Sequence, residues 1–269
     1  MIDVFPSRTV AIEILGFPIR WYGVMYLLGF LLAFVLLPRL QQLRGLKLTR
    51  DDWASLISWG VLGVIIGGRL GYVLLYEPMY FAADPSEIIA VWRGGMSSHG
   101  GFIGVTLVLF LWSYWHKVDL RKLADIIVIP AAIGLAIGRI GNFINQELYG
   151  TVTTIPWAIE IPGVIGLRHP VQLYAMLNNL LIAGLCFLHL RSVTPVHPGR
   201  TAALFLILYG IMRFLLEYLR AQEYPLINLG ILLSRGQLYS LPLILAGVLL
   251  WLWLGRERTS DGADMAPSG

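Results

Sequence analysis

The sequence has little charge and almost no cysteine. Of its 269 residues only 13% are charged, whereas a soluble globular domain has about 25%. This deficit excludes an intrinsically disordered chain and argues strongly against a soluble globule of this size. The single cysteine, Cys186, excludes a disulfide framework and a metal site built from several thiolates. Histidines and carboxylates show no metal-ligand spacing such as HExxH, so we expect no metal.

Two further absences bear on partners and on membrane insertion. The net charge of +4 and the pI near 9.3 do not indicate nucleic-acid binding, because the basic residues are separated by long apolar runs instead of gathering on one polar face. The first fifteen residues, MIDVFPSRTVAIEIL, lack the basic start, apolar middle and small-residue cleavage site of a signal peptide. We therefore expect the first apolar helix to direct insertion.

Long apolar runs are what the sequence does contain: 57% of residues are hydrophobic and the mean hydropathy is +0.71. A helix of about 20 apolar residues crosses a bilayer. Seven stretches meet this requirement, namely 17–37, 53–76, 96–115, 123–144, 171–190, 201–219 and 238–254. The fourth is the least regular, because Pro130 and three glycines invite a break. We predict an all-α integral membrane protein with seven transmembrane helices.

The connecting segments complete the predicted organisation. Residues 1–255 form the transmembrane domain, and the outer loop at about 146–170, which contains TVTTIPWAIEIPG, forms a small extended or hairpin cap. Residues 256–269 form a polar, disordered tail. Eleven Lys and Arg residues follow the odd-numbered spans and six lie on the opposite side. The positive-inside rule then places the N-terminus on the outer side of the membrane and the C-terminus in the cytoplasm.

The remaining three basic residues, Arg69, Arg139 and Arg213, lie within spans. On the predicted topology all three fall in the outer half of the membrane. Ionisable groups at this depth are costly and usually functional, although a long arginine near a helix end can also extend to the headgroups. Arginines offer forked donors to phosphate oxygens, and the abundant phosphate in a bilayer is carried by lipids. The sequence thus favours a lipid-phosphate site near the outer surface.

Neighbouring residues refine this prediction. Arg213 has Tyr209 at i−4 and Glu217 at i+4, so it could instead be an internally paired structural arginine. Arg139 has Asn142 at i+3. Asp125, at the start of the fourth span, suits a helix N-terminus and is expected to be structural.

His99 lies at the same predicted depth within MSSHGGFIG. Imidazole titrates near neutrality and can act as a general base, although a lone histidine is more often simply hydrogen-bonded at the interface. The glycines that follow it would let a ligand approach the backbone. His169 is a weaker candidate, and Cys186, which is surrounded by apolar residues, is expected to be inert.

The segment GRIGNFINQELYG (138–150) resembles the signature of the prolipoprotein diacylglyceryl transferase family. Six further blocks resemble the family in the same order: WYGVMYLLGF, GGRLGYVLLY, GGMSSHGGFIG, RHPVQLYAM, YGIMRFLLEYLR and GQLYSLP. One departure is Ala175, where the family commonly has glutamate after QLY. That glutamate is therefore not expected to be indispensable.

The resemblance implies a multi-pass enzyme of the bacterial inner membrane, with membrane lipids around it. It would transfer the diacylglyceryl group of phosphatidylglycerol to the lipobox cysteine of a prolipoprotein signal peptide. A thioether forms, glycerol phosphate leaves, and no cofactor is required. His99 is then the expected base and Arg139 and Arg213 the catalytic cations, with Arg69 supporting the fold. The residues that match the family's substrate site are Tyr22, Asn142, Glu147, Gly150 and Tyr209.

Two other classes of protein remain as alternatives. A transporter or flippase for an anionic lipid would use the same arginines, but it would need polar residues through both halves of the membrane. Asp125 is the only ionisable residue near the inner end of a span, which weighs against transport. An assembly protein would pair its arginines with acids, and only Arg213 has one within helical reach, at Glu217.

Overall fold

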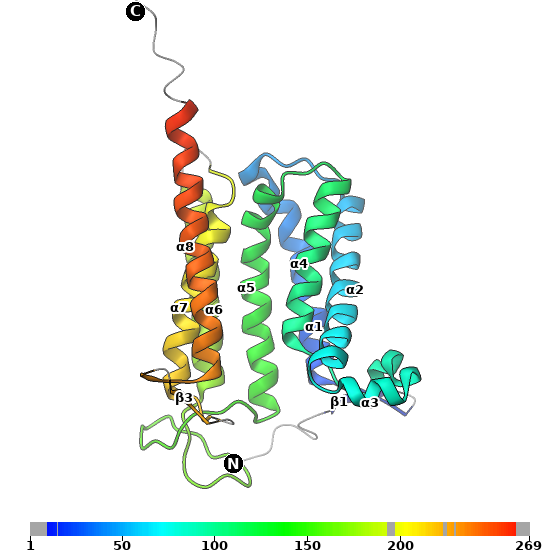
Figure 1. Cartoon of the computed structure of the whole chain (residues 1–269), viewed down its shortest axis with the longest axis vertical. Helices are drawn as coiled ribbons and strands as arrows, with labels where there is room; N and C mark the ends of the chain where they lie inside the picture. The colour runs from blue at the N-terminus through cyan, green and yellow to red at the C-terminus, as the bar shows by residue number, and fades with distance from the viewer. Residues whose placement is uncertain (1–9, 15, 193–196, 223–224, 229, 262–269) are drawn as a thin grey trace, which may run out of the picture. The chain divides into compact units, whose positions relative to one another are not determined.

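The computed structural model describes residues 10–14, 16–192, 197–222, 225–228 and 230–261, and it is mainly helical (Figure 1). Its long helices are α1 (Trp21–Leu40), α2 (Arg50–Leu75), α4 (Ser98–Trp115), α5 (Leu120–Ile144), α6 (Val171–Ser192), α7 (Arg200–Leu216) and α8 (Arg235–Asp261). The short helical elements are η1 (Gln41–Arg44), α3 (Pro78–Ala83), η2 (Pro85–Ile89), η3 (Val91–Arg93) and η4 (Glu217–Leu219). Two antiparallel hairpins pair β1 (Val10–Ile14) with β2 (Phe17–Arg20) and β3 (Ile227–Asn228) with β4 (Leu232–Leu233).

Each predicted span corresponds to one long helix. Within the described residues, six of these helices are long and apolar enough to cross a membrane. The helix outside this set is α4, which is 18 residues long and begins with the polar residues Ser98 and His99. Pro130 lies inside α5 without ending it, because the helix runs unbroken to Ile144. The all-α membrane class is confirmed.

The predicted start of the first span was wrong. Residues Phe17–Arg20 form strand β2, and α1 begins only at Trp21. Pro18 lies in this strand opposite Glu13, and the pairing with β1 holds the segment extended. At the other end of the chain, α8 continues to Asp261, past the predicted boundary at residue 255, and 262–269 of the predicted tail lie outside the described residues.

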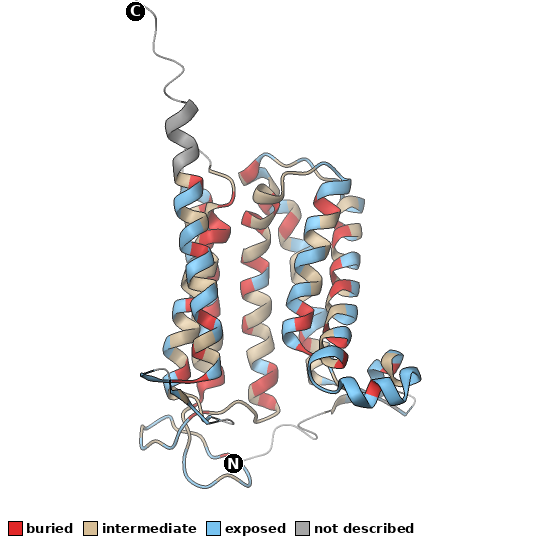
Figure 2. Ribbon diagram, viewed as in Figure 1, coloured by how far each residue is buried: buried red, intermediate tan, exposed pale blue. Residues whose placement is uncertain are grey.

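The outward faces of the long helices are apolar. Leu74, Leu188 and Trp253 are among many large hydrophobic side chains that are exposed, and exposed residues recur along every long helix (Figure 2). A water-soluble protein rarely presents so much contiguous apolar surface. The same surface is what lipid tails require of a membrane protein.

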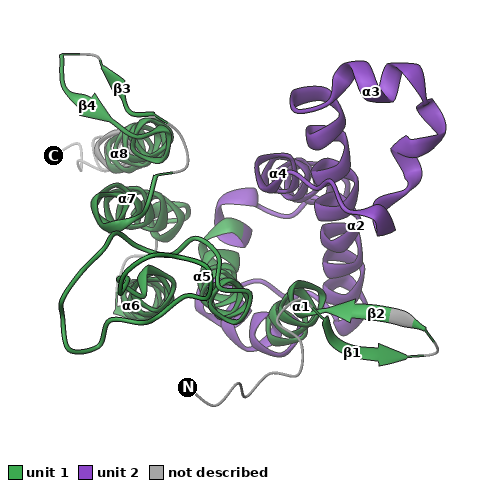
Figure 3. Ribbon diagram, turned by 90° about the horizontal axis from the view of Figure 1, so that it is seen from below, with its two compact units in different colours: residues 1–33, 124–269 green, residues 34–123 purple. Residues whose placement is uncertain are grey.

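The chain forms two compact units, described separately below (Figure 3). Unit 1 comprises Met1–Ala33 and Ala124–Gly269, and therefore the first part of α1 with α5 to α8. Unit 2 comprises Phe34–Leu123, with the end of α1, α2, α3 and α4.

Unit 2 is built on direct backbone contact between α2 and α4. A Cβ atom added to Gly67 would lie 2.4 Å from the carbonyl oxygen of Gly100, and one added to Gly104 would lie 2.1 Å from that of Gly63. Both distances are too short for any side chain. Small residues four apart allow this close approach between membrane helices, so the glycines of GVIIGGRLG and HGGFIG form a packing surface.

In unit 1, Asp125 links two helices. Its side chain is fully buried, and its two carboxylate oxygens accept hydrogen bonds from the backbone N–H groups of Gly199 (3.0 Å) and Ala202 (2.9 Å) at the start of α7. The structural role predicted for Asp125 is confirmed, but the helix it caps is α7 and not its own helix α5. The carboxylate satisfies N–H groups that have no partner within the first turn of α7.

Candidate active site

An open pocket lies in unit 1. It is lined by Arg139, Leu148, Val171, Gln172, Ala175, Asn178, Asn179, Tyr209, Met212, Arg213, Leu216 and Arg220. Three arginines thus face one cavity, from α5, from α7 and from the residue that follows η4. The structure brings together the two arginines predicted as catalytic, Arg139 and Arg213, and adds a third, Arg220.

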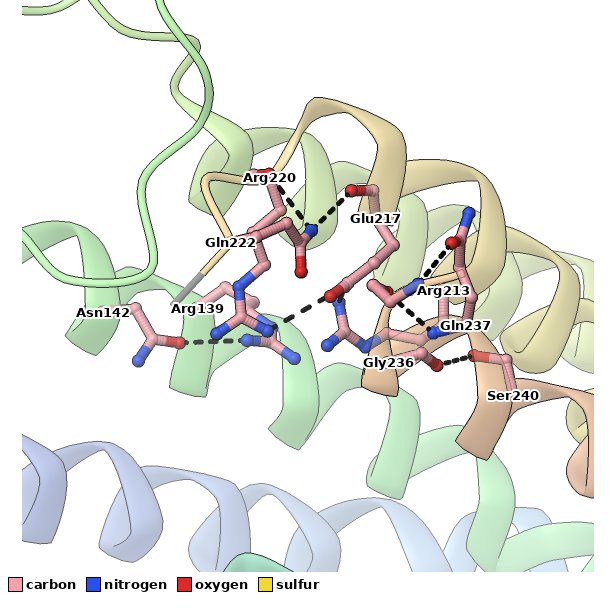
Figure 4. A network of polar contacts seen from close by, with 10 residues as sticks. Arg139, Asn142, Arg213, Glu217, Arg220, Gln222, Gly236, Gln237 and Ser240 are labelled. Atoms are coloured by element: carbon pink, nitrogen blue, oxygen red, sulfur yellow. Dashed lines mark hydrogen bonds and ion pairs between the residues drawn. The ribbon is translucent and has the colours of Figure 1, made fainter. Parts of the chain in front are cut away.

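Glu217 lies at the centre of the arginine cluster (Figure 4). Its carboxylate oxygen Oε2 is 2.5 Å from Nη1 of Arg213 and 3.9 Å from Nη1 of Arg220. The pairing of Arg213 with Glu217 predicted from the i,i+4 spacing is confirmed. Glu217 is only 4% exposed, and a Cβ atom added to Gly236 would lie 2.6 Å from its Oε1. A side chain at residue 236 would therefore displace this carboxylate.

Three guanidinium groups, those of Arg139, Arg213 and Arg220, lie close to one another in this cluster. Guanidinium groups offer forked donors, which suit an anion with several oxygens, such as a phosphodiester.

A second hydrogen-bond network orients Arg139. Its Nη1 donates to Oδ1 of Asn142 at 3.3 Å, and Nδ2 of Asn142 donates to Oε1 of Glu147 at 2.9 Å and to the hydroxyl of Tyr22. Arg139 is also hydrogen-bonded to Tyr209. Four residues matched to the family's substrate site thus contact Arg139 directly or through Asn142. Tyr22, Asn142 and Glu147 lie behind the pocket lining, whereas Tyr209 is part of it.

Gly150 is required by the path of the chain. Its N–H donates to the carbonyl of His169 at 2.9 Å, and it forms a bridge with Arg220. A Cβ atom there would lie 2.5 Å from that of His169 and 2.7 Å from the carbonyl oxygen of Leu219. Gly150 does not line the pocket. It lets the 146–170 loop run beside Arg220, which does.

The 146–170 loop is extended, as predicted, although isolated bridges replace a regular hairpin. Val152 and Ile159 both pair with Arg168. Gln146 and Leu148 have positive φ angles of 55° and 54°, which non-glycine residues rarely adopt. Because Leu148 also lines the pocket, this uncommon backbone conformation is located at the site itself.

His99 belongs to unit 2. It is exposed in the first turn of α4, where Oγ of Ser97 caps the helix by accepting from the N–H of Gly100 at 3.2 Å. The expectation that the glycines after His99 would admit a ligand was wrong for Gly100 and Gly104, because both pack against the backbone of α2. The role of His99 as a base stays a prediction.

Arg69, also in unit 2, is a structural residue. It is 6% exposed, and its guanidinium donates to the carbonyls of Glu87 (2.5 Å), Ile88 (2.8 Å), Gly94 (2.6 Å) and Gly95 (3.0 Å). These four bonds fasten the segment that joins α3 to α4 onto α2. The expected fold-supporting role is confirmed.

Several pocket residues have no clear signal in the sequence. Arg220 is one of the six basic residues expected on the outer side, and only its spacing of seven from Arg213 and three from Glu217 hints at the cluster. In the structure it follows η4 in an extended conformation. The amides of Gln172, Asn178 and Asn179 carried no signal of their own beyond the QLY block. Within the described part of the chain, no three histidine, cysteine or acidic side chains gather as a metal ion would require.

These features define a class: a polytopic membrane protein with a partly enclosed, positively charged site for an anionic group. Comparison with known proteins gives the family. The family model described as prolipoprotein diacylglyceryl transferase matches residues 9–253. The chain therefore belongs to the prolipoprotein diacylglyceryl transferase family, and it is a transferase.

Individual relatives align with this chain over nearly their whole length. Proteins named phosphatidylglycerol–prolipoprotein diacylglyceryl transferase from Bordetella parapertussis and Geobacter sulfurreducens are each 43% identical to this chain. The alignments cover 92% and 89% of this chain and 95% and 92% of the relatives. The protein of the same name from Pasteurella multocida is 43% identical, with 90% of each chain covered.

Proposed function

We propose that this protein transfers the sn-1,2-diacylglyceryl group of phosphatidylglycerol to the lipobox cysteine of a prolipoprotein, the first step in lipoprotein maturation. The observation that carries the proposal is the pocket of Arg139, Arg213 and Arg220 in a chain of this family. Guanidinium groups gathered in one pocket suit the phosphodiester of an anionic lipid. A transporter or flippase is not favoured, because the matching family and relatives are transferases.

The reaction exchanges one bond at the lipid glycerol. The cysteine thiolate attacks the phosphate-bearing carbon of the diacylated glycerol. A C–S bond forms at this carbon, and its C–O bond to the phosphate breaks. The electron pair of that bond remains on the departing glycerol phosphate, which becomes a phosphate monoester. Arg139 and Arg213 stabilise the charge that develops on its oxygens, with Arg220 as a third donor.

The thiol must lose its proton before or during attack. A free cysteine has a pKa of about 8.5, so a nearby base raises the thiolate fraction at neutral pH. We assign this role to His99 on the basis of its chemistry and its match to the family. Tyr22, Asn142, Glu147 and Tyr209 orient Arg139 and the bound headgroup, and Gly150 secures the loop beside Arg220.

We further propose that the chain has seven spans, α4 being the one added to the six helices that are long and apolar enough to cross a membrane. The N-terminus lies in the periplasm and the C-terminus in the cytoplasm, across the inner membrane of a bacterium. The support is the excess of basic residues after the odd-numbered spans. Cysteine accessibility at engineered sites in the 146–170 loop and after α8 would test it, since only the loop should react with an impermeant reagent.

One assay tests the function. Purified protein in detergent is given phosphatidylglycerol and a peptide with a lipobox cysteine, and both glycerol phosphate release and the peptide mass are measured. We expect a thioether-linked diacylglyceryl peptide, and no product with a Cys→Ser peptide. Equal release of glycerol phosphate with the cysteine peptide and the serine peptide would refute transfer to the cysteine.

A further inference from the structure

The pocket of unit 1 has two chemically different walls. The arginine wall comes from α5, from α7 and from Arg220. The amide wall is one face of α6, where Gln172, Ala175, Asn178 and Asn179 recur at helical spacing. The phosphate of an anionic lipid accounts for the first wall, whereas the amide side chains of the second wall are uncharged and can both donate and accept hydrogen bonds.

Gln172 has a fixed orientation and an unused acceptor. Its side chain is 2% exposed, and its Nε2 donates to the backbone carbonyl of Glu147 at 2.7 Å. A carbonyl accepts only from a donor, so this bond establishes which end of the amide is NH₂. The other end, Oε1, is buried and has no hydrogen-bond partner among the described residues. A buried acceptor left in this state is costly unless a ligand supplies a donor.

The surroundings restrict what that donor can be. Among the described residues no carboxylate lines the pocket, whereas three guanidinium groups do. The carboxylate of Glu217 is already paired with Arg213, so an ammonium headgroup would meet like charges in the pocket. A neutral hydroxyl attached a few bonds from the phosphate meets no such penalty, and it can donate to Oε1 of Gln172 and accept from the neighbouring amides.

We propose that Gln172 recognises a hydroxyl of the polyol that esterifies the lipid phosphate, so that α6 selects a glycerol headgroup while the arginines hold the phosphate. This proposal rests on the proposed function and specifies how its lipid substrate is selected. Asn178 and Asn179 complete the amide wall beside that hydroxyl.

The test compares two lipids with identical acyl chains. Phosphatidylglycerol and phosphatidyl-1-propanol both release a phosphate monoester of a primary alcohol, so their intrinsic reactivity matches and only the headgroup hydroxyls differ. With a lipobox peptide as acceptor, we expect kcat/KM of the unaltered protein to be about tenfold or more higher for phosphatidylglycerol. In Gln172→Met the ratio of the two values should fall to about 1.

Two further variants separate recognition from folding. Gln172→Lys keeps a donor for the Glu147 carbonyl and removes the acceptor, so it should also lose the preference even if the methionine variant does not fold. Gln237→Met is the matched control: Gln237 is a buried glutamine of the same unit whose Oε1 accepts from the N–H of Ser234 at 2.9 Å, and it does not line the pocket. Its lipid preference should equal that of the unaltered protein.

Three results would overturn the assignment: equal use of both lipids by the unaltered protein, a preference that survives in the folded Gln172 variants, or an equal loss of preference in the Gln237 control. In each case phosphatidylglycerol is still used. Failure of the proposed function is distinguishable, because no thioether product then forms from either lipid, and the assignment falls with it.

Discussion

Replacing Arg69 with methionine should destabilise one segment of the protein and affect chemistry only as a consequence. The methionine keeps the apolar stem and removes the donors to the carbonyls of Glu87, Ile88, Gly94 and Gly95. A net hydrogen bond is worth about 1 kcal/mol, and the freed carbonyls lie in a segment that water can reach, so the four bonds sum to about 4 kcal/mol. This is a large part of the total stability of a typical domain.

The assay combines thermal unfolding in detergent with limited proteolysis. Cleavage between residues 84 and 96 should become rapid in Arg69→Met, because the connection between α3 and α4 is no longer held to α2. Arg69→Lys should be intermediate, since one ammonium cannot reach four carbonyls. Arg69→Met with an unchanged melting temperature and unchanged cleavage, but with no transfer activity, would refute the structural assignment and make Arg69 a functional residue.

Four further predictions follow from other sites. Arg139→Ala should lower kcat/KM by about 100-fold or more while the melting temperature stays within a few degrees, because a transition-state donor is lost; retained activity would contradict its role. His99→Gln should lower kcat by about 10²-fold or more at neutral pH, and a near-normal rate would exclude His99 as the base. Gly150→Ala should cost about 1–3 kcal/mol of stability through its contacts with His169 and Leu219, measured by thermal unfolding, and a neutral result would show that the loop can move aside. Asp125→Ala should lower the free energy of unfolding by about 2 kcal/mol through loss of the α7 cap, with normal activity per folded molecule. Asp125→Asn keeps one acceptor and should lower it less. Equal melting temperatures for the two variants would argue against capping.

The long helices could be predicted from the sequence because apolar length is a local property. Each apolar run required only neighbouring residues to be recognised, and the pairing of Arg213 with Glu217 required only helical spacing. The start of α1 could not be predicted in this way, because Phe17–Arg20 is held extended by pairing with β1.

The remaining features depend on contacts between distant residues. Asp125 caps a helix that begins about 75 positions later in the chain, and no local rule connects the two. The role of the glycines after His99 depended on α2 lying against them. In the sequence Gln172 is an ordinary polar residue; its bond from Nε2 to the carbonyl of Glu147, and its buried Oε1 without a partner among the described residues, depend on the fold.

The backbone contact between α2 and α4 has a consequence for His99. Gly100, the next residue after it, packs directly against Gly67 and Gly71, so main-chain contact fixes the spacing between α2 and the first turn of α4. The position of the His99 ring therefore depends on main-chain atoms of α2. A methyl group added at Gly67 alters no charge and removes no hydrogen bond, yet it forces the two helices apart and shifts the imidazole with them. Uncharged residues on α2 therefore contribute to the position of this imidazole.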